Sequence, residues 1–134
     1  MKLKFPYQVR TSPIFGQVPT IKLRLPLKTI EGIEVFTFLF DTGADVTSMP
    51  ISAAEKLGID IKKCKKILMS GFEGSTITVH LSKISLVLDG KSFTIPCVFN
   101  PNINVALLLG RAGILNKFTI TMDAKKKVAI FQEI

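Results

Sequence analysis

Alternation of apolar and polar positions predicts β-strands over most of this chain. Residues 20–27 (TIKLRLPL) alternate as a strand with one buried face does, and residues 35–40 (VFTFLF) are rich in aromatic and β-branched side chains. Asp89 and Gly90 form an Asp-Gly pair between two apolar runs, which predicts a tight hairpin turn. Further strands are predicted at residues 65–70, 75–82, 84–88, 92–99, 104–110, 119–123 and 127–132.

Two segments break this β pattern. Residues 51–58 (ISAAEKLG) follow Pro50 and end at Gly58, a punctuation typical of a short helix. Residues 111–118 (RAGILNKF) fit either a short helix or a turn. The chain is therefore expected to form an all-β, mainly antiparallel fold with one or two short helices.

Length and composition favour one domain that spans residues 1–134. The chain has 134 residues, 47% of them hydrophobic, which is enough for one core. Its longest apolar runs are too short to cross a bilayer. The first ten residues lack the continuous apolar segment of a secretion signal. We therefore expect a soluble, cytoplasmic protein with no membrane partner.

Charge and cysteine content argue against a nucleic-acid-binding protein and against a metalloprotein. The net charge is +8, but the lysines stand in short groups without interleaved aromatic residues. No DNA-binding motif spacing is present, so we expect no nucleic-acid partner. The two cysteines, Cys64 and Cys97, and the single histidine, His80, match no metal-site spacing. We expect two reduced, partly buried thiols, no metal and no cofactor.

The stretch FLFDTGADVTSMP (38–50) carries the candidate chemistry. An apolar run leads directly into Asp41, and a carboxylate in that place is costly unless it is held or used. Thr42 and Gly43 supply a hydroxyl, main-chain N–H groups and a turn of little bulk. Such a loop can present a carboxylate that activates water, and with one histidine no Ser-His-Asp set is convincing. The alternative is a turn-forming aspartate at the end of a strand.

Aspartic proteolysis needs a second carboxylate, because two such groups share one proton. No other Asp-(Thr/Ser)-Gly tripeptide occurs here, and Asp60, Asp89 and Asp123 lie in other contexts. The sequence therefore predicts that Asp41 of a second copy completes the site, on the two-fold axis of a homodimer. Such a pair predicts a bell-shaped pH dependence of activity, with an optimum on the acidic side of neutrality.

Three segments together resemble the retropepsin-like aspartic proteases, which include retroviral proteases and their cellular and prokaryotic relatives. They are LFDTGAD (39–45), MSGFEGST (69–76) and ALLLGRAGI (106–114), in the family's order and spacing. The resemblance covers roughly residues 20–131. It implies a closed β-barrel of the acid-protease type that works as a homodimer. It also implies an aspartic endopeptidase acting on peptide or protein substrates.

The resemblance also implies roles for single residues. Asp41 would be catalytic, Thr42 would bond across the dimer axis, and Gly43 would face the substrate backbone. The expected substrate-binding residues belong to the same loop and to a flap over the cleft: Ala44, Asp45, Gly71, Phe72, Glu73 and Gly74. The expected structural support of the site, in which Arg111 pairs with Asp45, is Leu108, Leu109, Gly110 and Arg111.

Apolar residues flank these motifs and predict a cleft that prefers apolar side chains. The expected walls are Val46, Phe72, Leu107, Leu109 and Ile114. Two other functions stay open at this point. One is a retropepsin-like module that dimerises and holds peptides without cutting them, although the intact Asp-Thr-Gly argues against it. The other is a basic β domain that binds nucleic acid.

Overall fold

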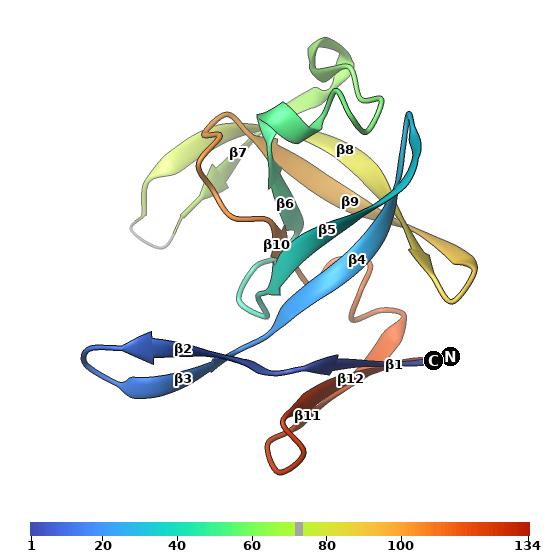
Figure 1. Ribbon diagram of the computed structural model, residues 1–134. Helices are drawn as coiled ribbons and strands as arrows, with labels where there is room; N and C mark the ends of the chain where they lie inside the picture. The colour runs from blue at the N-terminus through green and yellow to red at the C-terminus, as the bar shows by residue number, and fades with distance from the viewer. Residues whose placement is uncertain (72–73) are drawn as a thin grey trace.

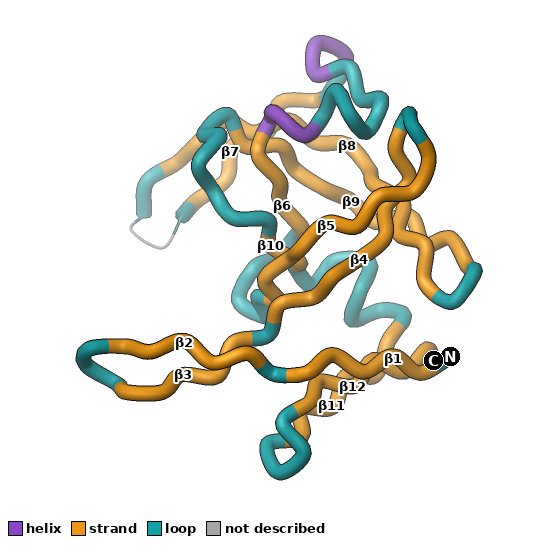
Figure 2. Tube along the Cα trace, viewed as in Figure 1, coloured by secondary structure: helices purple, strands orange, loops and turns teal. Residues whose placement is uncertain are grey.

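The computed structural model describes residues 1–71 and 74–134, and the regular structure in this part of the chain is mainly β (Figures 1 and 2). Its largest sheet has the strand order β4-β5-β10-β6-β9-β8-β7. The strands of this sheet are β4 (Lys22–Thr29), β5 (Gly32–Phe40), β6 (Thr47–Pro50), β7 (Lys65–Ser70), β8 (Thr76–Leu88), β9 (Lys91–Asn100) and β10 (Leu108–Leu109).

The two ends of the chain form a second sheet, with the order β1-β12-β11. The main-chain N–H of Glu133 donates to the carbonyl of Met1 at 3.1 Å, and the termini lie together in Figure 1. A separate hairpin, β2–β3, projects beyond the rest of the chain in the same view. These strands are β1 (Lys2–Pro6), β2 (Gln8–Ser12), β3 (Gly16–Thr20), β11 (Phe118–Asp123) and β12 (Val128–Glu133).

The hydrophobic core follows the alternation seen in the sequence. On β4, the side chains of Leu23, Leu25 and Leu27 are buried while the residues between them are more exposed. The terminal sheet contributes to the same core, and the rings of Phe40 and Phe131 meet edge-on with their centroids 5.2 Å apart. The terminal sheet thus packs against the end of β5, the strand that leads to Asp41.

The positions of the expected turns and short helical segments are largely confirmed. Asp89 and Gly90 both have positive φ angles, of 50° and 74°, as a tight hairpin turn requires. Residues 51–58 form a single 3₁₀ turn, η1 (Ile51–Ala53), followed by further turns, and a second 3₁₀ turn is η2 (Ile61–Lys63). The main chain after residue 111 folds into successive turns rather than a helix. The all-β fold with few short helices is therefore confirmed.

Three details differ from the expected strands. The predicted strands at 75–82 and 84–88 are one strand, β8, because Ser82 and Lys83 continue the ladder with β9. The predicted strand at 104–110 shrinks to β10, which lies between β5 and β6. Two pairings, β5–β10 and β6–β9, are parallel.

A residue pair joins β4, the first strand of this order, to β8, the strand next to its last member, β7. Leu27 of β4 lies opposite Leu86 of β8, so the succession of pairings from β4 to β8 returns to β4. No helix in residues 1–71 and 74–134 is long and apolar enough to span a membrane.

Candidate active site

The loop that carries Asp41 is held between two strands that are far apart in sequence. The main-chain N–H of Leu39 donates to the carbonyl of Leu107 at 2.8 Å, and that of Asp41 donates to the carbonyl of Leu109 at 3.0 Å. β10 therefore continues the sheet beside the end of β5 and fixes the point at which the chain leaves the strand. A strand as short as β10 is sufficient, because it has only to hold the end of β5.

The Asp41 carboxylate is positioned by its own loop. The N–H of Gly43 donates to Oδ1 of Asp41 at 2.9 Å, and the N–H of Ala44 donates to the carbonyl of Asp41 at 3.2 Å. Asp41 is half-buried, while Thr42 and Gly43 are exposed. A Cβ added at Gly43 would lie 3.2 Å from Oδ1, so glycine leaves this oxygen uncrowded. The loop thus presents a held carboxylate beside an exposed turn.

Arg111 ties the segment after β10 to this loop. Its Nη1 donates to the carbonyl of Thr42 at 2.9 Å, and its Nη2 forms an ion pair with Oδ1 of Asp45. The main-chain N–H groups of Arg111 and Ala112 donate to the carbonyls of Ala44 and Asp45. The Asp45 side chain is 81% exposed and that of Arg111 is 44% exposed, so the ion pair alone contributes little in a single chain. The bonds to main-chain carbonyls hold the loop more firmly.

Gly110 and Thr47 form a buried contact beneath the loop. A Cβ at Gly110 would lie 2.3 Å from the carbonyl carbon of Val46, so no side chain fits there. The N–H of Gly110 donates to Oγ1 of Thr47 at 3.1 Å, and Thr47 is fully buried. Sequence reasoning named Gly110 but missed Thr47. Thr47 and Met49 are both buried in β6, a strand that the sequence pattern did not predict.

A hollow of about 590 Å³ opens beside Asp41. Seven of the residues expected in the site, under it or in its walls line it: Asp41, Gly43, Ala44, Asp45, Val46, Gly71 and Leu108. Its remaining walls come from β6, β7, β8 and β9. Four of these residues are apolar, Met69, Ile77, Val79 and Val98, and three are polar, Ser48, Ser70 and Asn100. The hollow can thus hold an extended, largely apolar ligand across the Asp41 loop.

Some expected residues lie elsewhere. Leu107, Leu109 and Ile114, expected as cleft walls, do not line the hollow, because Leu109 and Ile114 are buried in the core and Leu107 packs against it. The N–H of Gly74 donates to the carbonyl of Gly71 at 3.1 Å, at the tip of the β7–β8 hairpin. The expected flap residues Phe72 and Glu73 lie outside the described residues.

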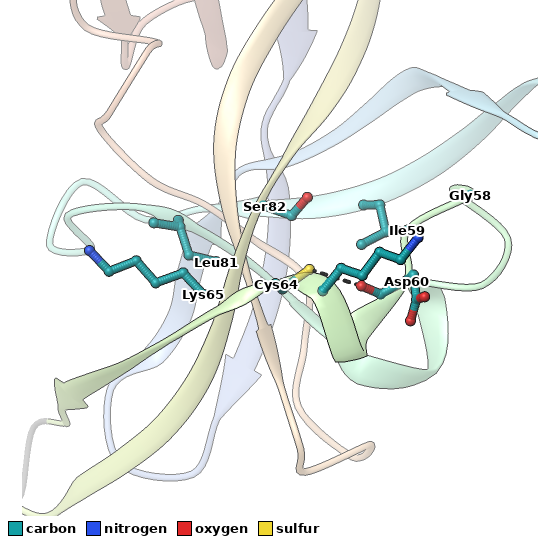
Figure 3. A pocket seen from close by; sticks show the side chains of 8 residues that line it. Gly58, Ile59, Asp60, Cys64, Lys65, Leu81 and Ser82 are labelled. Carbon is teal, nitrogen blue, oxygen red and sulfur yellow. Dashed lines mark hydrogen bonds between the residues drawn. The ribbon is translucent and has the colours of Figure 1, made fainter.

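A second hollow, of about 460 Å³, surrounds Cys64 and contains none of the expected site residues (Figure 3). The Cys64 Sγ donates to the carbonyl of Asp60 at 3.4 Å, and Asp60 is the one carboxylate that lines this hollow. The other thiol, Cys97, is fully buried, and burial raises its pKa to about 12. Both cysteines are free, as expected. Within the described residues, no three potential metal-ligating side chains cluster.

An Asp-Thr-Gly loop at the end of a central strand, held by main-chain bonds beside an apolar hollow, has the features of an aspartic protease. A family model described as aspartyl protease matches residues 28–112. The chain therefore belongs to the aspartyl protease family, and its fold is of the retropepsin-like type. It is similar to the crystal structure of a retropepsin-like aspartic protease from Rickettsia conorii, with a TM-score of 0.69 and 19% sequence identity over 98% of this chain and 89% of that chain. A search of curated proteins finds no match.

Proposed function

We propose that this chain is an aspartic endopeptidase in which two copies of Asp41, one from each subunit of a homodimer, activate a water molecule. One observation carries the proposal. In the described part of the chain, the carboxylates that line the large hollow are Asp41 and Asp45, and Asp45 is engaged by Arg111. Asp41 therefore has no second free carboxylate of its own chain beside it there, and a second copy is the simplest source.

The chemistry follows from two carboxylates that share one proton. The ionised Asp41 takes a proton from water as the water oxygen bonds to the scissile carbonyl carbon. The protonated Asp41 of the second copy donates its proton to the carbonyl oxygen. The Asp41 that took the proton from water then gives it to the amide nitrogen, and the other Asp41 takes a proton from a hydroxyl of the gem-diol. The C–N bond breaks, and a carboxylic acid and an amine leave. The N–H of Gly43 holds one carboxylate oxygen throughout, which supports a fixed orientation of the base.

The hollow supports a peptide substrate bound in extended form. Gly43, Ala44 and Asp45 of the Asp41 loop line it, and so does Gly71 at the tip of the β7–β8 hairpin. Residues 71–74 would then close over the peptide as a flap. The apolar walls, with Val46, support a preference for apolar side chains on both sides of the cleaved bond.

The architecture expected of this enzyme is a closed barrel in one domain, residues 1–134. The Leu27–Leu86 pair supports closure, because it returns the strand order to β4. The shared core supports one domain, because two aromatic pairs join the terminal sheet to the main sheet. Phe118 packs with Phe93, and Phe131 packs with Phe40.

A mixed peptide library tests the proposal. Wild-type protein and the Asp41→Asn variant are incubated with the library at several pH values, and the products are identified by mass spectrometry. We expect cleavage next to apolar residues by the wild type alone, with a bell-shaped pH profile on the acidic side. Comparable cleavage by Asp41→Asn would refute the aspartic mechanism. Retention of peptides by both proteins, without cleavage, would favour a binding module instead.

A further inference from the structure

The β2–β3 hairpin, residues 8–20, is a two-stranded sheet that joins neither of the larger sheets; we call it the arm. Its strands pair with each other, from Gln8 opposite Thr20 to Ser12 opposite Gly16, and with no other strand among residues 1–71 and 74–134. Figure 1 shows the arm extending away from both larger sheets. A two-stranded hairpin standing alone in water is marginally stable at best. An arm of this kind therefore gains stability when another surface covers it.

The tip of the arm displays two large apolar side chains. Ile14 is 82% exposed and Phe15 is 77% exposed. The hydroxyl of Ser12 accepts hydrogen bonds from the N–H groups of Ile14 and Phe15, at 3.2 and 3.1 Å. The tip is thus held in one turn while its side chains face water. Exposed aliphatic and aromatic side chains on a preformed turn are typical anchors of a protein interface.

The base of the arm lies next to the catalytic loop. The N–H of Phe40 donates to the carbonyl of Ile21 at 2.9 Å, and Lys22 pairs with Leu39. The arm thus begins within one residue pair of the strand end that carries Asp41. Strands of five residues reach about 15 Å from this base. A second copy that brings its own Asp41 to this site must therefore lie within reach of the arm.

We propose that the arm grips the second copy of this chain in the active dimer, with Ile14 and Phe15 packed against the partner subunit. The proposal rests on the proposed function, because the partner is the copy that completes the site. The two-fold symmetry of such a dimer makes both arms equivalent, so each subunit holds the other. The contact is separate from the terminal sheet, in which β1 already pairs with β12 of its own chain.

The test compares two double variants in an Asp41→Asn background, which prevents self-cleavage. Ile14→Ser/Phe15→Ser removes the apolar tip. The control, Ile33→Ser/Val35→Ser, removes two residues of β5 that are 59% and 52% exposed but lie outside the arm. Sedimentation equilibrium gives the dimer dissociation constant of each. We expect the arm variant to raise this constant at least about tenfold and the control to change it less than about twofold.

Hydrogen exchange provides a second measurement on the unaltered arm. Amides of residues 9–18 should exchange more slowly at concentrations where the chain is dimeric than after dilution to monomer. An unchanged dissociation constant together with unprotected arm amides in the dimer would overturn the proposal. When the arm variant is made in active Asp41 protein, weaker cleavage of a protein substrate with an unchanged dimer constant would also overturn it and would assign the arm to the substrate.

The two proposals fail in different ways. If the wild type cleaves peptides and dimerises but the arm variant dimerises equally well, the role of the arm is wrong and the proposed function stands. If the wild type neither dimerises nor cleaves at any concentration, both fail. In active Asp41 protein, the arm variant should lose activity on dilution at a higher concentration than the control, and added protein should restore it.

Discussion

The N–H of Gly43 donates a hydrogen bond to Oδ1 of Asp41 at 2.9 Å, within a loop of one chain. The carboxylate is therefore oriented before any second subunit arrives. Arg111, which lies 69 positions after Thr42 in the sequence, also orders this loop, because its Nη1 donates to the carbonyl of Thr42 at 2.9 Å. Dimerisation would then bring together two loops that are already formed, which lowers the ordering cost of assembly.

Asp41→Asn subunits added in excess should inhibit the wild-type protein. The amide keeps the size of the side chain and can still accept from the N–H of Gly43, so the variant should fold and pair with wild-type chains. Each mixed pair lacks one carboxylate and should be inactive. Activity per wild-type chain should fall as the variant is added and approach zero at large excess. Asp89→Asn, at an exposed turn, is the control and should not inhibit; equal effects of both would contradict a shared site.

Arg111→Lys should reduce activity more than stability. Lysine keeps the charge, but its single ammonium cannot reproduce the planar fork that reaches both Thr42 and Asp45. Because both side chains of the ion pair are substantially exposed, we expect the free energy of unfolding to fall by less than about 1 kcal/mol. Measurement of kcat/KM beside a thermal melt separates the two effects. Unchanged kcat/KM would show that Arg111 does not position the loop.

Thr47→Val should destabilise the fold. The substitution keeps the shape but leaves the buried N–H of Gly110 without the Oγ1 acceptor, 3.1 Å away, at a cost of roughly 1–3 kcal/mol. Thr47→Ser keeps the hydroxyl and should lose less. Urea unfolding of the three proteins gives the order of stability, and a valine variant as stable as the serine variant would rule out this bond as a support of the site.

The two thiols should react at very different rates. Burial raises the pKa of Cys97 to about 12, so at mildly alkaline pH it stays a protonated, inaccessible thiol. Cys64 is only half-buried. We expect a thiol reagent to label Cys64 in the native protein and Cys97 only in denaturant, as read by mass spectrometry. Cys64→Ser should then leave the native protein unlabelled, and rapid labelling of that variant would refute the burial of Cys97.

The ion pair between Lys91 and Glu133 should make stability depend on pH at both extremes. Nζ of Lys91 lies 2.8 Å from Oε1 of Glu133 and joins β9 to β12. The hydrogen bond from Lys91 lowers the pKa of Glu133, so its contribution is present above the ordinary carboxyl range and is lost as pH falls through the lowered pKa. The same bond raises the pKa of Lys91, so its contribution is lost as pH rises through the raised value.

Glu133→Gln tests this ion pair. The difference in melting temperature between wild type and variant should be present near neutral pH and disappear in strong acid. The effect should be small, because the pair lies at the surface. Glu34→Gln, which breaks the surface pair of Glu34 with Lys56, is a matched control. A difference that persists unchanged below pH 2 would show that the charge of Glu133 is not its cause.

Local pattern in the sequence determined much of this protein. The alternation on β4, the Asp-Gly turn at Asp89 and the Asp41 loop after an apolar strand were all predicted, because each depends on residues that are neighbours along the chain. The three strands before residue 21 were not predicted. The arm exposes most of its residues, so it carries no alternation of buried and exposed positions to indicate a strand.

Tertiary structure decided what supports the Asp41 loop. The strand predicted at 104–110 is reduced to the two residues of β10, which pairs with β5 on one side and with β6 on the other. The bond from Gly110 to Thr47 joins residues 63 positions apart, and that from Arg111 to Thr42 joins residues 69 apart. Burial and hydrogen bonding between such distant residues arise only when packing brings the strands together, and local sequence patterns carry no signal for which distant strands will meet.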